Sequence, residues 1–127
     1  MNAPSSAVIA TLLLLSHGHQ SSAQGQPRWA CHGKTTIAIE QCFRAELSRE
    51  DDKLRAVSAR IRATIDTSAR ALMDSAGVAW GNYRDAQCMS VYRSYTGGSV
   101  AGMQLLACKI ALTQERRRTL TNMYTMR

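Results

Sequence analysis

The side chains best suited to catalysis do not form a recognisable catalytic set in this chain of 127 residues. His32 is the only histidine beyond residue 23, and no serine stands in a GxSxG-like sequence. Asp51 and Asp52 are adjacent, so on a helix their side chains point about 100° apart and do not face each other as a general acid and base. We therefore expect no catalytic residue, no cofactor and no enzyme activity.

The four cysteines favour disulfide chemistry over metal binding. No CxxC spacing is present, and His32 is the only histidine beyond residue 23, so the pattern does not favour a zinc site. An even number of cysteines is typical of disulfides in an oxidising compartment, so we expect two bridges and no bound metal. The cysteines are Cys31, Cys42, Cys88 and Cys108.

Their positions indicate a helical hairpin near the C-terminus. Cys88 and Cys108 lie at equal distances along the chain from Gly98, so a turn at Gly97 and Gly98 would bring the two sulfurs level on antiparallel helices. Cys31 can then meet Cys42 only if the segment before the helix folds back, because eleven helical residues would hold them about 16 Å apart. Pairing of Cys31 with Cys88 or Cys108 remains an alternative.

Arg84 and the three arginines at residues 116–118 are candidates for binding a partner. Trp80, Arg84 and Cys88 recur every four residues, which places Arg84 over the indole on one helix face. Arg84 either contacts a partner or braces the hairpin against a carboxylate such as that of Asp51 or Asp52, and bracing is the favoured interpretation. Residues 116–118 are three consecutive arginines, which spread over three directions on a helix, so solvation is favoured over phosphate binding.

Apolar periodicity predicts the helices that position these residues. Thr35 or Thr36 can cap a first helix that reaches about Asp66, with charged residues, among them Glu50, on a solvated face. A second helix follows, and a third begins near Val100 or Ala101. The apolar stripes are Ile39, Phe43, Leu47, Leu54, Val57, Ile61 and Ile65; then Leu72, Ala76, Trp80, Tyr83, Gln87 and Val91; then Met103, Leu106, Ile110, Thr113, Leu120 and Tyr124, interrupted by Arg117.

We therefore predict an all-α fold, a small antiparallel helical bundle of three main helices with a disulfide-linked C-terminal hairpin. Gly77 and Gly81 lie within the second helix, where we expect them to permit close helix packing. No strand-like alternation competes with this interpretation.

The first 23 residues resemble a secretory signal peptide, with the apolar run at residues 7–15 and small residues before a predicted cleavage at Gln24. An uncleaved anchor is the alternative. Residues 24–127 then form a single domain that begins with an irregular arm at 24–35, which Trp29 is expected to pin to the core. The net charge is +7, and the basic surplus is concentrated from Lys109 onward.

An ordered set of short motifs resembles the family of small secreted bacterial proteins named after the lysozyme inhibitor LprI. The resemblance extends from about Cys31 to Leu120, and Arg55, Ser58 and Gly77 depart from its usual pattern. We expect a structural role for the motif residues Trp80, Arg84, Gly97, Gly98, Thr113 and Arg116. The matching motifs are Glu40-Gln41-Cys42, Asp51-(x2)-Leu54, Trp80-(x3)-Arg84-Asp85-(x2)-Cys88, Gly97-Gly98-Ser99, Cys108 and Leu112-Thr113-(x2)-Arg116-(x3)-Leu120.

The resemblance implies a periplasmic or secreted, non-enzymatic binding protein of the bacterial envelope that inhibits a lysozyme or another cell-wall hydrolase. The alternative is an envelope protein that binds lipopolysaccharide or another polyanion through its basic C-terminal helix; nucleic acid is not an expected partner. A further alternative is an envelope protein whose partner no motif reveals. The candidate partner-binding residues are Tyr95 and Thr96 at the hairpin tip and Arg116, Arg117 and Arg118.

Overall fold

The structure is a computed structural model that describes residue 31, residue 33 and residues 35–125. This part of the chain forms three α-helices, α1 (Thr36–Thr64), α2 (Thr67–Ser94) and α3 (Ser99–Thr125), and contains no strand. The prediction of an all-α protein with three main helices is confirmed. The predicted signal peptide, Trp29, His32 and most of the predicted arm lie outside the described residues.

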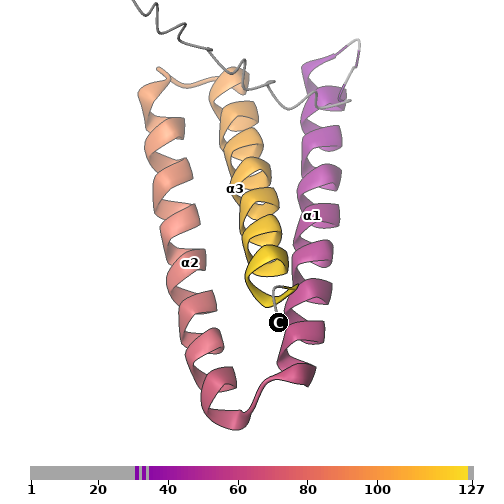
Figure 1. Cartoon of the computed structure of the whole chain (residues 1–127). Helices are drawn as coiled ribbons and strands as arrows, with labels where there is room; N and C mark the ends of the chain where they lie inside the picture. Colours follow the sequence, from indigo (N-terminus) through magenta and orange to yellow (C-terminus); the bar gives the residue numbers. More distant parts are fainter. Residues whose placement is uncertain (1–30, 32, 34, 126–127) are drawn as a thin grey trace, which may run out of the picture.

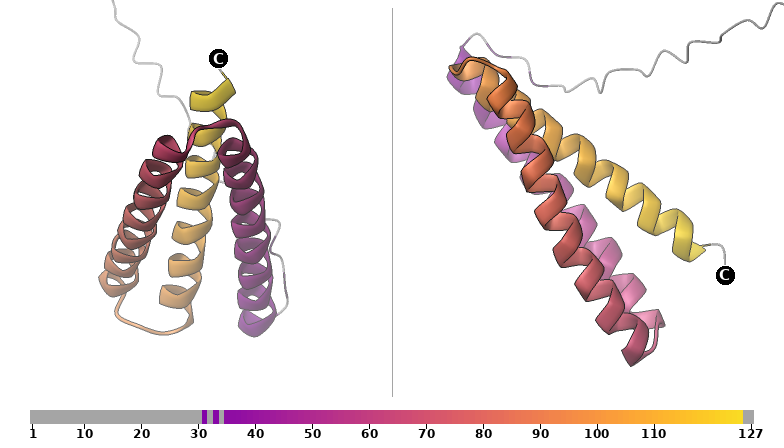
Figure 2. Two further views of the ribbon diagram at one scale, coloured as in Figure 1. Left: turned by 90° about the horizontal axis from the view of Figure 1, so that it is seen from below. Right: turned by 90° about the vertical axis from the view of Figure 1, so that its left-hand side faces the viewer.

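Helix α3 is the central element of the arrangement. In Figure 1, α1 and α2 are antiparallel neighbours in the chain that both extend upward from the turn joining them, and α3 lies between them. Both outer helices pack against α3. The right-hand view of Figure 2 shows that α3 diverges from the other two helices toward its C-terminal end. One face of the α1 and α2 pair is therefore covered by α3 and the other is not.

Side-chain caps explain where two of the helices begin. The Thr35 hydroxyl accepts a hydrogen bond from the Ala38 backbone N–H at 3.2 Å, and the Asp66 carboxylate accepts one from the Ala69 N–H at 2.8 Å. Asp66, near which the first helix was expected to end, is thus the N-cap of α2. Helix α3 starts one residue earlier than predicted, at Ser99.

The turn between α2 and α3 uses the freedom of glycine. Gly97 and Gly98 have φ angles of 98° and 85°, a region that other residues rarely adopt. Below this turn, a disulfide joins Cys88 to Cys108, whose Cα atoms are 5.5 Å apart. The second disulfide joins Cys31 to Cys42, also with Cα atoms 5.5 Å apart, and attaches the residues before α1 to that helix.

The apolar stripes predicted for α1 and α3 supply the core. Val57, Ile61, Ile65 and Leu120 form its main cluster near the turn between α1 and α2. Further along α3, Leu106 and Ile110 are buried. Each of these residues belongs to a predicted stripe, and burial of such side chains is the main stabilising term in folding.

The stripe predicted for α2 is wrong in part. Leu72 is 71% exposed and Tyr83 is 55% exposed, and Cys88 is the only buried residue of α2. The reason is that α2 packs mainly on α3, along a narrow strip, and has no layer on its other side. The close packing expected at Gly77 and Gly81 is also wrong, because a Cβ atom at either position would meet nothing within 4 Å.

Candidate functional site

A polar network joins the three helices at mid-height and contains the residues that sequence motifs single out. Arg84 on α2 donates from Nη1 to the Asp51 carboxylate on α1 at 2.7 Å and to the Thr113 hydroxyl on α3 at 2.9 Å. Thr113 is fully buried and donates to the Lys109 carbonyl at 2.8 Å. Arg84 therefore links all three helices through one guanidinium group.

The indole of Trp80 completes the surroundings of this guanidinium. The Arg84 Cζ atom lies 5.0 Å from the ring centroid of Trp80, one turn earlier on α2, within the range of a cation–π contact. The side chain of Arg84 is only 16% exposed, so little water screens these interactions. This geometry corresponds to the bracing interpretation of Arg84 rather than to an exposed binding residue.

Glu50 is a second buried charge, which the sequence interpretation placed wrongly on a solvated face. It is 2% exposed, because α3 crosses α1 at this point. Lys53 donates to Glu50 Oε1 at 2.6 Å, and Arg117 Nε on α3 lies 3.4 Å from Glu50 Oε2. The arginine that interrupts the apolar stripe of α3 thus has an acidic counterpart on α1. The presence of Arg117 within this apolar stripe was the one feature of the sequence that pointed to a buried acidic partner.

The pKa of Glu50 reflects a contest between burial and positive charge. Burial raises it, but the hydrogen bond and charge of Lys53, together with Arg117 and Gln114, outweigh burial and lower the pKa below the ordinary value of 4.5. A lowered folded-state pKa means that ionised Glu50 stabilises the fold above about pH 4.5 and that this contribution is lost as the pH falls through the folded-state pKa.

Replacing Glu50 by glutamine should therefore flatten the acid limb of the stability curve. We expect the free energy of unfolding of Glu50→Gln to fall less between pH 6 and pH 3 than that of the wild type, measured by urea denaturation at each pH. Glu46→Gln, which removes an accessible carboxylate from the same helix, is the matched control. If the stability of Glu50→Gln falls as steeply with decreasing pH as that of the wild type, Glu50 does not have a lowered pKa in the folded state.

Asp85 and Lys109 form a third cross-helix pair, between α2 and α3. Lys109 Nζ lies 3.0 Å from Asp85 Oδ1. The hydrogen bond from Lys109 lowers the pKa of Asp85, against a smaller opposing effect of burial. The side chain of Asp85 is 58% exposed, so this pair is screened by water and contributes less than the Arg84 contacts.

The chemistry of these groups is that of ion pairing. Each carboxylate in the network, on Glu50, Asp51 and Asp85, has a cationic partner. Within the described part of the chain, no group of three or more histidine, cysteine or acidic residues could hold a metal ion. The network positions helices rather than reacting groups.

The predicted partner-binding residues do not form one surface. Tyr95 and Thr96 are exposed at the turn between α2 and α3, whereas the three arginines lie about 26 Å further along α3. The arginines also diverge: Arg117 turns to Glu50, Arg118 is exposed, and Arg116 lines a cavity between the helices.

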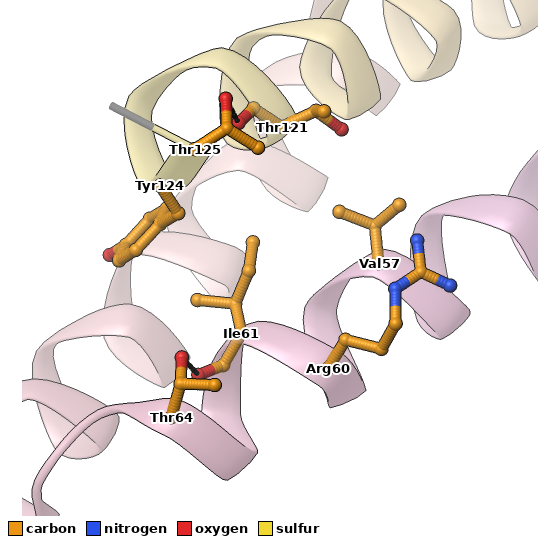
Figure 3. A pocket seen from close by; sticks show the side chains of 7 residues that line it. All are labelled: Val57, Arg60, Ile61, Thr64, Thr121, Tyr124 and Thr125. Atoms are coloured by element: carbon orange, nitrogen blue, oxygen red, sulfur yellow. Dashed lines mark hydrogen bonds between the residues drawn. The ribbon is translucent and has the colours of Figure 1, made fainter. Parts of the chain in front are cut away.

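Among the cavities along the described part of α1, two are lined by the C-terminal half of α3, and sequence reasoning missed both. The smaller has a volume of about 210 Å³ and lies between the ends of the two helices (Figure 3). Arg60 is its only charged lining residue. The larger has a volume of about 420 Å³ and is lined by all three helices, including Arg116. Cavities between helices depend on how the helices cross, which no local pattern encodes.

Taken together, the fold and its network define a disulfide-bonded, three-helix protein whose helices are joined by ion pairs. Among the described helices, none combines the length and hydropathy needed to span a lipid bilayer. Residues 30–120 match the protein family described as lysozyme inhibitor LprI, and the chain belongs to this family. Neither the curated proteins nor the solved structures that were compared with the chain gave a match.

Proposed function

We propose that this protein is an exported, non-enzymatic binding protein that inhibits a lysozyme or a related cell-wall hydrolase by occluding its cleft. The observation that carries the proposal is the match to the lysozyme inhibitor family over residues 30–120. Two disulfides suit an oxidising compartment such as the bacterial periplasm or the extracellular space. The ion-paired carboxylates support binding rather than catalysis.

The tip between α2 and α3 is the surface best suited to enter a cleft. It projects at one end of the molecule, where Tyr95 is 40% exposed and Val100 is 49% exposed. The disulfide between Cys88 and Cys108 holds the helices below it, which reduces the entropy lost on binding.

The charge of the tip also suits this role. The protein is basic, and like charges would disfavour contact with a basic lysozyme. Residues 94–108, however, contain no charged side chain. Glycoside hydrolases carry two carboxyl groups in the cleft, and a tip rich in uncharged hydrogen-bond donors can contact them without a buried unpaired charge. Tyr95, Thr96 and Ser99 supply such donors.

The proposal predicts that truncating Tyr95 weakens inhibition without affecting the fold. In a peptidoglycan turbidity assay with several lysozyme types, we expect Tyr95→Ala to raise the inhibition constant about 30-fold, as loss of a central aromatic anchor does. Tyr83→Ala is the matched control, because Tyr83 is 55% exposed on α2 and away from the tip. Absence of inhibition by the wild-type protein at micromolar concentration would refute the proposed function. Equal effects of the two variants would refute the proposal that the tip is the surface that contacts the hydrolase.

Binding of an envelope polyanion by Arg116, Arg117 and Arg118 has less support. The guanidinium of Arg117 faces the buried carboxylate of Glu50, and Arg116 lines the cavity between the helices. Only Arg118 of the three is exposed. A surface that binds polyanions needs several cations side by side.

A further inference from the structure

The larger cavity is a groove between α1 and α2 with α3 beneath it. In the left-hand view of Figure 2, α3 lies between the two outer helices. The groove has a volume of about 420 Å³, within the range of small-molecule sites. Its lining residues are Leu54, Arg55, Ser58, Ala59 and Arg62 of α1; Met73, Gly77 and Trp80 of α2; and Arg116 and Leu120 of α3.

The interior of this groove is apolar. Leu120 belongs to the main core cluster, and Leu54 and Met73 pack against that cluster, so the floor of the groove is the edge of the core itself. Trp80 adds an indole face, and Gly77 adds no side chain at all. The empty space beside Gly77, where a Cβ would meet nothing within 4 Å, keeps the groove open. Such a surface favours an aliphatic chain.

The charged groups of the groove are all positive. No carboxylate lines it, whereas three guanidinium groups do. Arg55 and Arg62 already pair with Asp52 and Asp74 outside the lining. Arg116 has no hydrogen-bond or ion-pair partner among the described residues, although it is partly buried. An anionic group beside Arg116 would therefore gain a charge-assisted contact without displacing an existing one.

We propose that this groove binds a single-chain anionic amphiphile of the fatty-acid type, with its carboxylate at Arg116 and its tail along Leu54, Met73 and Trp80. An inorganic anion would leave the apolar walls uncovered. Trp80 lines the groove and its fluorescence reports on occupancy.

The test is a titration with dodecanoate below its micelle-forming concentration, with no lysozyme present. The background variant is Trp29→Phe, which leaves Trp80 as the only tryptophan. We expect a saturable fluorescence change with one molecule bound per chain and no such change with dodecylammonium. Arg116→Gln should weaken binding about ten-fold, as loss of a charge-assisted contact does. Arg118→Gln, which removes the same charge from an exposed neighbour, should change it less than two-fold.

A second pair of variants tests the apolar part of the groove. Gly77→Leu places a branched side chain in the groove and should weaken dodecanoate binding at least ten-fold, whereas Gly77→Ala should bind nearly as the wild type does. Circular dichroism checks that both remain helical. The proposal is overturned if no saturable change occurs, if dodecylammonium binds equally well, or if Arg116→Gln and Arg118→Gln lose the same affinity. Binding only to vesicles of anionic lipid, and not to dodecanoate, would also overturn it.

Discussion

Replacing Cys88 and Cys108 by alanine is expected to lower the free energy of unfolding by more than 3 kcal/mol. Closure of a loop of 20 residues contributes about 3.3 kcal/mol in the chain-entropy account of disulfides. The bridge also includes Cys88, the only buried residue of α2, so its loss removes packing that holds α2 on α3. For a small domain with a stability of about 5–15 kcal/mol, this is a large fraction.

The other disulfide provides the matched control for this prediction. Cys31 and Cys42 close a loop of 11 residues, for which the same account gives about 2.8 kcal/mol. Loop entropy alone therefore gives the two bridges nearly equal contributions to the free energy of unfolding. We expect urea denaturation to show the larger loss for the Cys88 and Cys108 variant, together with faster hydrogen exchange in α2. A smaller loss than in the Cys31 and Cys42 variant would contradict the role given to α2 packing.

Replacing Arg84 by methionine is expected to cost about 2–3 kcal/mol. The change removes the contacts to Asp51 and Thr113 and leaves the fully buried Thr113 hydroxyl without the donor that it accepts from. Breaking a buried ion pair costs about 3–5 kcal/mol, but the Asp51 side chain is 31% exposed, so water compensates part of that cost. Methionine retains much of the arginine stem against Trp80 and keeps the helix intact.

Arg55→Met is the control, because Arg55 pairs with Asp52 on the surface and its side chain is 73% exposed. We expect this variant to lose less than about 1 kcal/mol in urea denaturation. A double-mutant cycle of Arg84→Met with Asp51→Asn isolates the energy of the pair itself. Equal losses in Arg84→Met and Arg55→Met would show that the network does not hold the helices together.

Local patterns predicted the elements of this fold well. The cap at Thr35, the glycine turn and the stripes of α1 and α3 each involve residues within a few positions of one another. Such short-range interactions are present in the sequence before any tertiary contact forms. The motifs also led to the right family, because their order along the chain is itself a sequence property.

The errors all concern contacts between helices. Glu50 was placed in solvent, because its neighbours along α1 are charged and nothing local distinguishes it from them. Leu72 and Tyr83 were placed in the core, because a helical stripe shows that a face is apolar without showing that another element covers it. The groove beside Gly77 was missed for the same reason.

The sequence by itself therefore determined three helices, the glycine turn and the family of this protein, because these depend on local spacing and on the order of motifs. Only the tertiary structure decided that Glu50 lies buried against Arg117, that Arg84 bridges Asp51 and Thr113, and that Arg116 faces a groove. Those outcomes depend on where α3 crosses α1 and α2. A crossing is set by the packing of side chains far apart in the chain, which no local pattern contains.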